Sequence, residues 1–342
     1  MQHLKQIIEG RQILTREAAR ALMQQILAGE LTEIHLAAAL SALATRGEAP
    51  SEIAGFVDVM RAAAVPVPLE LAERSILTDT CGTGADLSGT FNISTAAALV
   101  AAAAGATVAK HGNRAVTSQC GSADVLEALG IPVGLSPAEG AAALRKHRFA
   151  FFHAPSLHPA MKIVMPVRRA LGIRTIFHLV GPLSNPAGAS AQVMGVYAAH
   201  LVPIVAEAMA LLDTRHAFVV HGTAENPDGS HTGLDEISIS GPSEIAEIRN
   251  GAIVLGTLTP EDVGLERAPM EALRGGNAET NAAILEAIFS GERSPRRDIV
   301  LLNAAAVLVA SDLVPNLKEG VAAAARAIDS GAVTSLLESL RT

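Results

Sequence analysis

The stretch that most constrains the fold is residues 78–105, which reads TDTCGTGADLSGTFNISTAAALVAAAAG. The apolar pair Ile76-Leu77 just before it is expected to end a strand, and glycines follow at positions 82, 84 and 89. Asn92, Ser94 and Thr95 then precede a run of alanines. Alanine is the best helix former, and Asn, Ser and Thr are favoured helix caps. The stretch therefore predicts a strand, a glycine-rich loop and a helix.

A loop of this kind can bind an anion, because backbone N–H groups can approach it and the helix dipole adds a favourable field. Each such contact contributes only about 0.3–1 kcal/mol, so several donors must converge to hold a phosphate. The common phosphate-loop patterns do not fit. Leu87 stands where a dinucleotide fingerprint has its third glycine, and no lysine follows as in a P-loop. From this loop alone, a sharp turn and an anion site are equally open.

Composition excludes some partners. The 342 residues are enough for two domains, and they carry 3% aromatic residues and a formal net charge of -8. Binding of single-stranded nucleic acid uses aromatic stacking, and binding of any nucleic acid uses excess positive charge. We therefore expect no nucleic-acid partner.

The cysteines and the apolar runs bear on location. Cys81 and Cys120 form neither a disulfide framework nor a metal-type CxxC spacing, which favours a reducing cytoplasm. The first residues lack the apolar core of a signal peptide. The longest apolar runs, near residues 96–104 and 299–310, are too short to span a bilayer. A cytoplasmic protein without a membrane partner is expected.

Residues 1–64 predict a bundle of short helices. Leu36, Leu40 and Leu43 recur at helical spacing. The expected N-caps are Thr15, Thr32 and Ser51, and the expected stops are Gly29 and Gly47. Such short helices bury little by themselves, so a symmetric homodimer through this bundle is expected. The sequence VPVP at residues 65–68 predicts a stiff linker.

Beyond the linker, short apolar runs alternate with helical segments. Strands are expected at residues 106–109, 149–152 and 217–221. A helix is expected at residues 121–130, with Ser122 as its cap and Gly130 as its stop. Strands that alternate with helices predict a parallel sheet covered on both faces.

The later segments complete an α/β interpretation. Pro166 is expected to start a helix, and the glycine- and proline-rich piece after it is expected to return to the N-terminal helices. Residues 244–258 predict a hairpin that turns at Asn250-Gly251, Asn277 should cap a helix, and residues 299–310 should form a buried helix. The expected architecture is a small helical domain of residues 1–66, joined by 167–186, and a larger α/β domain. The α/β domain comprises residues 67–166 and 187–342 around a mostly parallel central sheet.

Residues 110–120, KHGNRAVTSQC, follow a predicted strand and so lie at the carboxyl edge of the sheet, where open α/β sheets bind ligands. Lys110 and Arg114 supply positive charge, and Asn113, Thr117 and Ser118 supply neutral donors. This mixture suits a phosphorylated or diphosphorylated ligand. The alternative is a loop whose cations face water, but a second donor-rich loop after a strand weakens it.

Asp235-Glu236 lies in HTGLDEISI, before a run that resembles a strand. Adjacent carboxylates suit Mg²⁺, which prefers oxygen ligands and retains waters beside phosphate oxygens. Ser94 is a candidate to complete the shell, and an exposed acidic turn is the alternative. One of Arg168 and Arg169, which open a helix, is a candidate to clamp a carboxylate, and an ordinary surface ion pair is the alternative. His153 and His158 match no zinc motif, and the two cysteines are expected to be small buried side chains.

Taken together, several segments resemble the anthranilate phosphoribosyltransferase family. They are DTCGTGAD, TFNIST, KHGNRAVTSQCGSADVLEALG, HAPSLHPAMK, PVRRALGIRTIF, GPLSNPA and GLDEISISGP. The resemblance covers essentially the whole chain, and its most specific part is KHGN…GSADVLEALG with HPAMK. One departure is Ala85, where the loop of the family usually reads GTGGD, so the ligand geometry there is in question.

The resemblance implies a fold of the nucleoside phosphorylase and phosphoribosyltransferase type, usually homodimeric. It implies a magnesium-dependent glycosyltransferase of tryptophan biosynthesis, which transfers phosphoribosyl from phosphoribosyl pyrophosphate to the amine of anthranilate. Two Mg²⁺ ions would be held by Ser94, Asp235 and Glu236.

By the same resemblance, the expected catalytic residues are Lys110, Asn113 and Arg168. The phosphoribosyl pyrophosphate site would be lined by Gly82, Ala85, Asp86, Thr90, Asn92, Ile93, Ser94, Thr95, Lys110, His111, Gly112, Asn113, Arg114, Ala115, Val116, Thr117, Ser118 and Cys120. Anthranilate would contact Gly82, Asn113 and Arg168, with His111, His158, Gly181 and Pro182 along its approach.

Two alternatives remain at this point. A pyrimidine nucleoside phosphorylase would share the architecture and also attack ribose C1, although its phosphate loop differs. A non-enzymatic relative of the same fold that binds nucleic acid would need a basic face and would not need the carboxylate pair. The net charge of -8 and the presence of Asp235-Glu236 argue against the second alternative.

Overall fold

A mixed sheet forms the centre of the chain. The computed structural model describes residues 2–84, 86, 88–115, 119–225 and 231–341. The strand order is β3-β2-β1-β4-β5-β7-β8, and β6 pairs with β5. The strands are β1 (Leu77–Gly82), β2 (Thr107–Gly112), β3 (Phe149–His153), β4 (Ala191–Gly195), β5 (His216–Glu225), β6 (His231–Leu234), β7 (Ser243–Arg249) and β8 (Ala252–Leu258). The first five pair in parallel and the last three antiparallel, which confirms the expected α/β class with a mostly parallel sheet.

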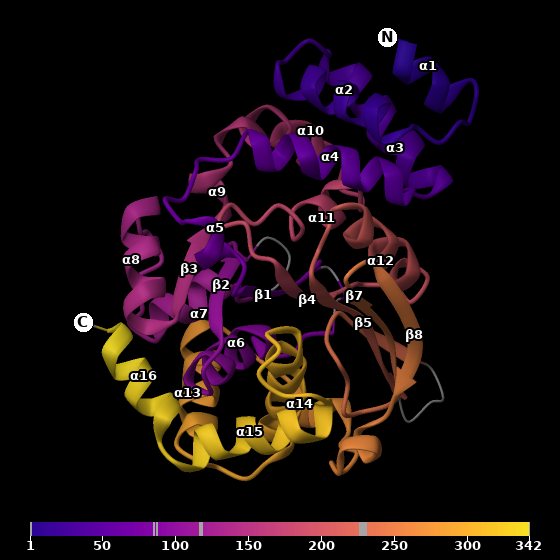
Figure 1. The fold of residues 1–342 in the computed structure, drawn as a ribbon. Helices are drawn as coiled ribbons and strands as arrows, with labels where there is room; N and C mark the ends of the chain where they lie inside the picture. Colours follow the sequence, from indigo (N-terminus) through magenta and orange to yellow (C-terminus); the bar gives the residue numbers. More distant parts are fainter. Residues whose placement is uncertain (1, 85, 87, 116–118, 226–230, 342) are drawn as a thin grey trace.

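Four helices at the start of the chain form the expected bundle, which lies above the sheet in Figure 1. They are α1 (Gln2–Ile8), α2 (Arg16–Leu27), α3 (Glu33–Arg46) and α4 (Pro50–Ala62). Thr15 and Thr32 cap α2 and α3 as predicted. The prediction for Ser51 was wrong, because Pro50 starts α4 with its fixed φ and Ser51 donates instead to the carbonyl of Leu14.

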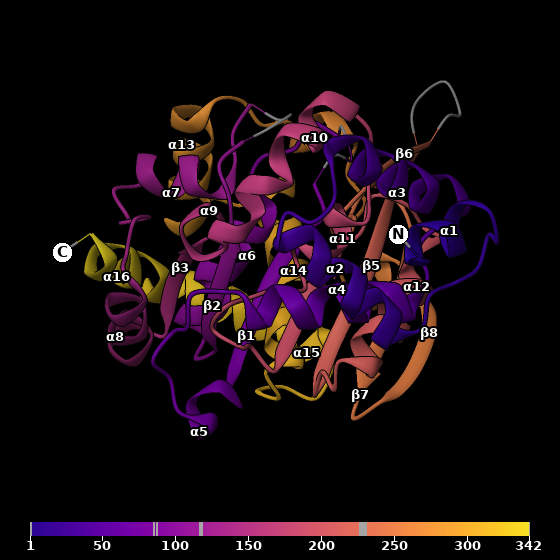
Figure 2. The same cartoon turned by 90° about the horizontal axis from the view of Figure 1, so that it is seen from above.

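Both faces of the sheet are covered. Side chains alternate along each strand, so Val193 of β4 joins one apolar cluster and Met194 joins another. The first face packs against α6 (Ile93–Ala103) and α14 (Pro295–Ala310). The second packs against α12 (Leu201–Leu211), which in turn contacts α4. Figure 2 shows the ends of the sheet, with α8 (Pro137–His147) beside β3 at one end and β8 at the other.

The remaining helices surround this core. The α-helices are α5 (Leu71–Arg74), α7 (Ser122–Ala128), α9 (Ala154–Leu157), α10 (Met165–Leu171), α11 (Phe177–Val180), α13 (Ala278–Phe289), α15 (Leu317–Asp329) and α16 (Ala332–Leu340). The 3-10 helices are η1 (Pro159–Ile163), η2 (Pro260–Val263) and η3 (Met270–Leu273). Helix α10 contacts α3, and α11 contacts α4. The rings of Phe56 on α4 and Phe177 on α11 have their centroids 6.2 Å apart. None of the helices in the described ranges has the length and hydropathy to cross a membrane.

Most local predictions hold. The hairpin turns at Asn250-Gly251, where both residues have positive φ, and Asn277 accepts a hydrogen bond from the backbone N–H of Thr280. Two boundaries were wrong. Gly121 is the N-cap of α7, because Asp124 bonds the Gly121 N–H and Ser122 is already helical. Leu77 begins β1 and does not end a strand.

Buried polar side chains explain that shift of β1. Two polar side chains of this strand are satisfied inside the protein: Thr78 bonds Ser311, and Asp79 accepts the backbone N–H of His111. Strand β2 likewise continues through Lys110 and His111, which the sequence placed in a loop. Polar residues that look like loop residues therefore extend both strands toward the carboxyl edge of the sheet.

Candidate active site at the carboxyl edge of the sheet

The carboxylate of Asp235 lies beside the end of β1, where it interacts electrostatically with Asp86 and Glu236. The backbone N–H of Gly84 donates to Oδ2 of Asp235 at 2.6 Å, and the N–H of Asp235 approaches Oδ2 of Asp86 at 3.3 Å. Any Cβ at Gly82 would overlap the Asp235 carboxylate, so glycine is needed there. The run after Glu236 was expected to be a strand and is irregular, because the side chain of Asn303 replaces a neighbouring strand as the partner of Ile237.

Burial and mutual repulsion disfavour the charged forms of this acidic pair. Burial, reinforced by Asp86 and Glu236, raises the pKa of Asp235 well above its usual range. Burial also raises the pKa of Glu236 to about 7, although Lys110 opposes that rise. A bound cation would relieve both effects, so the site favours a positively charged ligand.

Lys110 connects the end of β1 and the start of α6, and through Ser94 it is joined to Glu236. Its side chain is fully buried, and Nζ donates to the carbonyl of Thr80 at 2.7 Å and to Oγ of Ser94 at 3.4 Å. The backbone N–H of Ser94 in turn donates to Oε1 of Glu236 at 3.0 Å. Burial lowers the pKa of Lys110, while the surrounding acids oppose that shift. The structure therefore brings Ser94, Lys110 and Glu236 into one place.

Asp79 is a member of this network that the sequence interpretation missed. It is fully buried, and burial raises its pKa to about 6, although Lys110 opposes that rise. Its Oδ1 accepts the backbone N–H of His111 at 3.1 Å, which fixes β2 against β1. A lone carboxylate within a buried strand was the available signal, since buried acids are almost always paired.

The glycine-rich loop rests on a later segment of the chain. The backbone N–H of Phe91 donates to the carbonyl of Leu273, and Thr90 pairs with Arg274. Asn92 donates to the carbonyl of Cys120 at 3.2 Å, which joins the two expected ligand loops. Asn281 of α13 donates to Oδ1 of Asn92 at 2.8 Å. Asn281 was also missed, and only its nearness to the Asn277 cap pointed to it.

The start of α6 points its polar groups to the same edge. Ile93 and Thr95 lie in its first turn and are buried, and Oγ1 of Thr95 has no hydrogen-bond partner among the residues that the structure describes. Helix N-termini favour anions, so this end of α6 suits a phosphate.

Some expected residues lie apart from the carboxylates. Arg114 forms ion pairs with Asp124 at 3.0 Å and with Glu127 at 2.8 Å, so its guanidinium faces α7. Asn113 is exposed, and its Oδ1 accepts the N–H of Arg114. Gly112 ends β2, and the N–H of Ala115 donates to Asp124. The expectations for Ala85, Val116, Thr117 and Ser118 fall outside the described residues.

Arg168 lies on α10, outside this cluster. It is half-buried, burial lowers its pKa, and its guanidinium carbon lies 5.5 Å from the ring centroid of Phe177. It forms no ion pair in the part of the chain that the structure describes. A desolvated guanidinium of this kind suits a carboxylate ligand.

Two histidines and one turn form a further apolar surface. The rings of His111 and His158 meet edge to face with centroids 5.2 Å apart, and neither Nε2 has a partner within the described ranges. Burial lowers both pKa values, that of His111 to about 3, so both rings are neutral at pH 7. Gly181 follows α11, and the carbonyl of Pro182 accepts a hydrogen bond from Gln192 at 2.9 Å. Neutral rings that meet edge to face suit an aromatic ligand.

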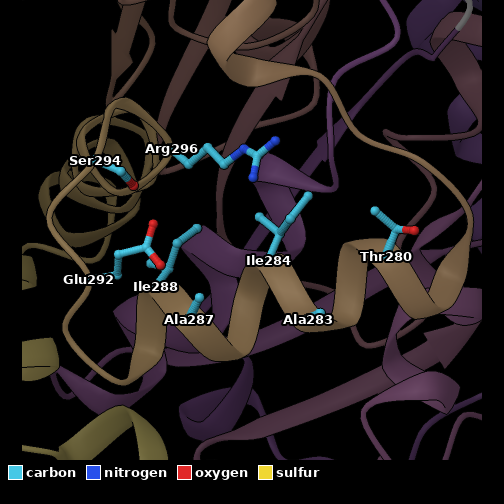
Figure 3. Close-up of a pocket in the computed structure, with 8 residues that line it drawn as sticks. All are labelled: Thr280, Ala283, Ile284, Ala287, Ile288, Glu292, Ser294 and Arg296. Carbon is cyan, nitrogen blue, oxygen red and sulfur yellow. The ribbon is translucent and has the colours of Figure 1, made fainter.

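A groove of about 440 Å³ lies elsewhere, along α13 (Figure 3). It is lined by Thr280, Ala283, Ile284, Ala287, Ile288, Glu292, Ser294 and Arg296. None of the expected site residues lines it. Arg296 donates to the carbonyls of Ala272 and Arg274, so its contacts support the segment behind the glycine-rich loop.

The donor set at the strand ends fits magnesium. It consists of oxygen atoms from Asp86, Asp235, Glu236 and Ser94, and Mg²⁺ prefers oxygen ligands. Within the described ranges, no three or more His, Cys, Asp or Glu side chains form a ready metal site. Mg²⁺ in proteins commonly uses one or two carboxylates and fills its shell with water and substrate phosphates.

Comparisons with known families agree with this geometry. The helical bundle domain of a glycosyl transferase family matches residues 1–64, and its a/b domain matches residues 74–334. An anthranilate phosphoribosyltransferase of Symbiobacterium thermophilum is 51% identical over 99% of this chain and 96% of its own length. One of Chloroflexus aggregans is 52% identical over 95% and 92%.

Solved structures extend the comparison to three dimensions. Anthranilate phosphoribosyltransferase from Thermus thermophilus superposes with a TM-score of 0.90, at 44% identity over 100% of this chain and 98% of that chain. The enzyme of Saccharomyces cerevisiae in complex with PRPP and Mg gives 0.83, at 27% identity over 98% and 95%. Sequence, fold and the arrangement at the strand ends all agree with the resemblance stated above, and the chain belongs to the anthranilate phosphoribosyltransferase family.

Proposed function

We propose that the chain transfers the 5-phosphoribosyl group of phosphoribosyl pyrophosphate to the amine of anthranilate. The products are N-(5-phosphoribosyl)anthranilate and pyrophosphate, and the reaction belongs to tryptophan biosynthesis. One observation carries the proposal: the buried Lys110 and the half-buried carboxylate of Glu236 both bond Ser94 at the carboxyl edge of the sheet, and the carboxylate of Asp235 lies close to that of Glu236. That combination supplies both signs of charge that a magnesium diphosphate requires.

The glycine-rich loop and the start of α6 would hold the phosphoribosyl pyrophosphate. The residues with this role are Gly82, Ala85, Asp86, Thr90, Asn92, Ile93, Ser94, Thr95, Cys120 and the residues from Lys110 to Ser118. The link from Asn92 to the carbonyl of Cys120 supports a single site for both loops. Arg114 would enter the site only after its ion pairs on α7 exchange for the ligand, since both partners hold it now.

Two Mg²⁺ ions would be held by Ser94, Asp235 and Glu236, with Asp86 beside them. When bound, these ions neutralise the charge that develops on the departing pyrophosphate. Lys110 adds a fixed cation, and burial lets it act without competition from water. The raised pKa values of Asp235 and Glu236 support the need for metal, since both acids carry unbalanced repulsion without it.

Arg168 would hold the carboxylate of anthranilate, and Gly82 and Asn113 would contact the same ligand. The aromatic amine is a weak, neutral nucleophile, so the residues contribute mainly by orienting it toward C1 of the ribose. As the bond to pyrophosphate breaks, C1 gains oxocarbenium character and the amine attacks it. The neutral pair His111 and His158 would line the approach with Gly181 and Pro182. The enzyme of Saccharomyces cerevisiae solved with 4-fluoroanthranilate, 26% identical with a TM-score of 0.82, supports this choice of acceptor.

The direct test mixes the chain with anthranilate, phosphoribosyl pyrophosphate and Mg²⁺ and follows the loss of anthranilate fluorescence. We expect loss only when all three are present, and none after Mg²⁺ is chelated. Phosphorolysis of thymidine with no use of anthranilate would instead identify a nucleoside phosphorylase.

We also propose a homodimer through the bundle. Ile13 on the segment before α2 is 63% exposed, and Ile34 at the start of α3 is 80% exposed. Large exposed apolar side chains on one small bundle favour burial against a second copy. Sedimentation as a monomer at micromolar concentration would exclude this arrangement.

The division into domains and the location belong to the same proposal. Residues 1–66 with 167–186 would form the helical unit, since α10 and α11 pack on α3 and α4. Residues 67–166 and 187–342 would form the α/β unit. The reaction would take place in the cytoplasm, which the free thiols of Cys81 and Cys120 support.

A further inference from the structure

The acidic pair lies on a short irregular segment, residues 235–237, that crosses the ends of three strands. A metal site requires that such ligands be held in a fixed geometry, and an irregular segment has no strand partner to hold it. We infer that Asn303 and Gly195 are the positioning residues of this segment, acting on Asp235 and Glu236 through its backbone. The inference rests on the proposed function, since it assigns these residues to the magnesium-binding pair.

Asn303 holds the segment from α14. Its side chain is buried, with 2% exposed. Its Oδ1 accepts the backbone N–H of Ile237 at 2.9 Å, and its Nδ2 donates to the carbonyl of Ile237, also at 2.9 Å. Nδ2 also donates to the carbonyl of Ile299 within α14 at 2.9 Å. One side chain thus satisfies both backbone groups of the residue after Glu236 and ties them to a buried helix.

Only an amide of this length can do so. An aspartate keeps an acceptor but has no donor for the Ile237 carbonyl, and an apolar side chain leaves both backbone groups unsatisfied. A buried backbone group without a hydrogen-bond partner is destabilising, so the segment would move to find new partners. Glu236 precedes Ile237 directly, so its carboxylate would move with it.

Gly195 of β4 and Gly222 of β5 leave room for the segment to lie directly against the strands. A Cβ on Gly195 would overlap the backbone carbonyl of Asp235. A Cβ on Gly222 would overlap the carbonyl of Glu236 and lie 2.9 Å from the backbone nitrogen of Ser238. Gly195 pairs with Gly82 across β4 and β1, so the segment crosses a surface that has no side chains. Both glycines are required by this close approach, which a methyl group would prevent.

The two contacts therefore act from different elements on the same three residues. Asn303 pulls Ile237 toward α14, and the absence of a side chain at Gly195 lets Asp235 lie against β4. Loss of either contact should displace the carboxylates without removing them. Supporting groups around metal ligands typically change metal affinity by about 10–100-fold when mutated.

The test measures metal binding directly, with Mn²⁺ in place of Mg²⁺ and phosphoribosyl pyrophosphate present. Free Mn²⁺ is followed by electron paramagnetic resonance. For Asn303→Leu we expect the Mn²⁺ dissociation constant to rise about tenfold or more. The matched control is Leu301→Ala on the same helix. Leu301 lies one turn before Ala305, which packs on Gly320 of the neighbouring helix α15. It removes buried volume but keeps the amide of Asn303 and its two hydrogen bonds to Ile237, so it should leave Mn²⁺ affinity within about twofold of the wild type.

The second variant is Gly195→Ala, with Gly256→Ala as its control. Gly256 has no atom within 4 Å of an added Cβ, so its substitution tests only the effect of a glycine change in a strand. We expect weaker Mn²⁺ binding for Gly195→Ala and unchanged Mn²⁺ binding for Gly256→Ala. The KM for anthranilate should stay within about twofold of the wild type in every variant. If Asn303→Leu fails to fold, Asn303→Asp and Gly195→Ala carry the test.

The outcomes separate the two levels of the argument. A wild-type chain that binds no Mn²⁺ with phosphoribosyl pyrophosphate would overturn the proposed function itself. Normal wild-type binding together with variants that match their controls would overturn only the positioning role of Asn303 and Gly195. Weakened binding confined to Asn303 and Gly195 variants supports that role.

Discussion

The two ends of strand β5 carry charged clusters of opposite design. At its start, His216 contacts Asp312 through Nδ1 at 3.1 Å and Glu247 through Nε2 at 2.9 Å. Asp312 also pairs with Arg215 and with Arg249. Near its other end, Gly222 lies against the backbone of Glu236, whose half-buried carboxylate neighbours Asp235 and Asp86. One end has a donor or a cation for each carboxylate, and the other has more acids than bases.

This difference indicates that one cluster has a structural role and that the other is a ligand site, although both lie on the same sheet. The cluster at the start of β5 is satisfied by its own residues, so it needs no ligand. The cluster at the other end holds acids whose pKa values are raised by burial and by one another. Perturbed acids of this kind favour a functional site, and a cation is the ligand that would balance them.

The largest effect is expected at the acidic pair. Asp235→Asn and Glu236→Gln should each lower turnover about 10²–10³-fold, because each removes a charge that stabilises the departing pyrophosphate through metal. The measurement is the rate of anthranilate consumption as a function of Mg²⁺ concentration.

The control for this prediction is Glu247→Gln at the other end of β5, which should leave the rate within about twofold of the wild type. If Asp235→Asn and Glu236→Gln both had wild-type rates at limiting Mg²⁺, the acidic pair would have no role in the reaction. The two clusters would then not differ in function.

A smaller effect is expected at the buried lysine of the site. Lys110→Met should lower kcat/KM for phosphoribosyl pyrophosphate by about 10–100-fold, since hydrogen bonds to charged groups contribute about 1.5–3 kcal/mol. Steady-state kinetics with varied phosphoribosyl pyrophosphate checks this. Lys146→Met, on the exposed side of α8, is the matched control, and an equal effect of both changes would contradict a local role.

Arg168 tests whether the second substrate lies apart from the charged cluster. Arg168→Ala should raise the KM for anthranilate about tenfold or more and change that for phosphoribosyl pyrophosphate much less, because its guanidinium is available for a carboxylate. Arg169→Ala changes the exposed neighbour on α10 and should have little effect. An unchanged KM for anthranilate in Arg168→Ala would exclude the assigned role.

The smallest effect is on stability and comes from Asp79. Its pKa of about 6 lies above the ordinary value of 3.8 in the unfolded chain, so the folded state binds more protons between these values. The free energy of unfolding should therefore fall as pH rises from about 4 to about 6. In Asp79→Asn this contribution disappears, while the neutral amide still accepts the N–H of His111.

Urea unfolding of the metal-free chain, wild type and Asp79→Asn, across that pH range measures the difference. Buried histidines have the opposite sign, since stability from a neutral buried His is lost as pH falls below about 6.5, but they contribute equally to both chains. A difference in unfolding free energy that does not grow with pH would contradict the assignment to Asp79.

Local sequence signals predicted a large part of the fold. Caps at Thr15, Thr32 and Asn277 were confirmed, because a cap depends on residues only three positions away. The positions of β1 and β2 were partly missed, because Thr78, Asp79 and Lys110 are polar and become strand residues only through long-range partners.

The site divides in the same way. Ser94, Lys110, Asp235 and Glu236 were identified as candidates from local motifs and from the resemblance. Asp79, Gly195 and Asn303 were missed, because their importance depends on what packs against them. The ion pairs of Arg114 were also invisible in the sequence, since Asp124 and Glu127 reach it only after α7 folds back.

The most direct measurement is a crystal structure of the chain with phosphoribosyl pyrophosphate and Mn²⁺, solved with anomalous data at the manganese edge. We predict anomalous peaks bound by the Asp235 and Glu236 carboxylates, with the diphosphate between them and the Nζ of Lys110. Peaks elsewhere on the chain, or a diphosphate bound away from the strand ends with Asp235 and Glu236 empty, would contradict the account.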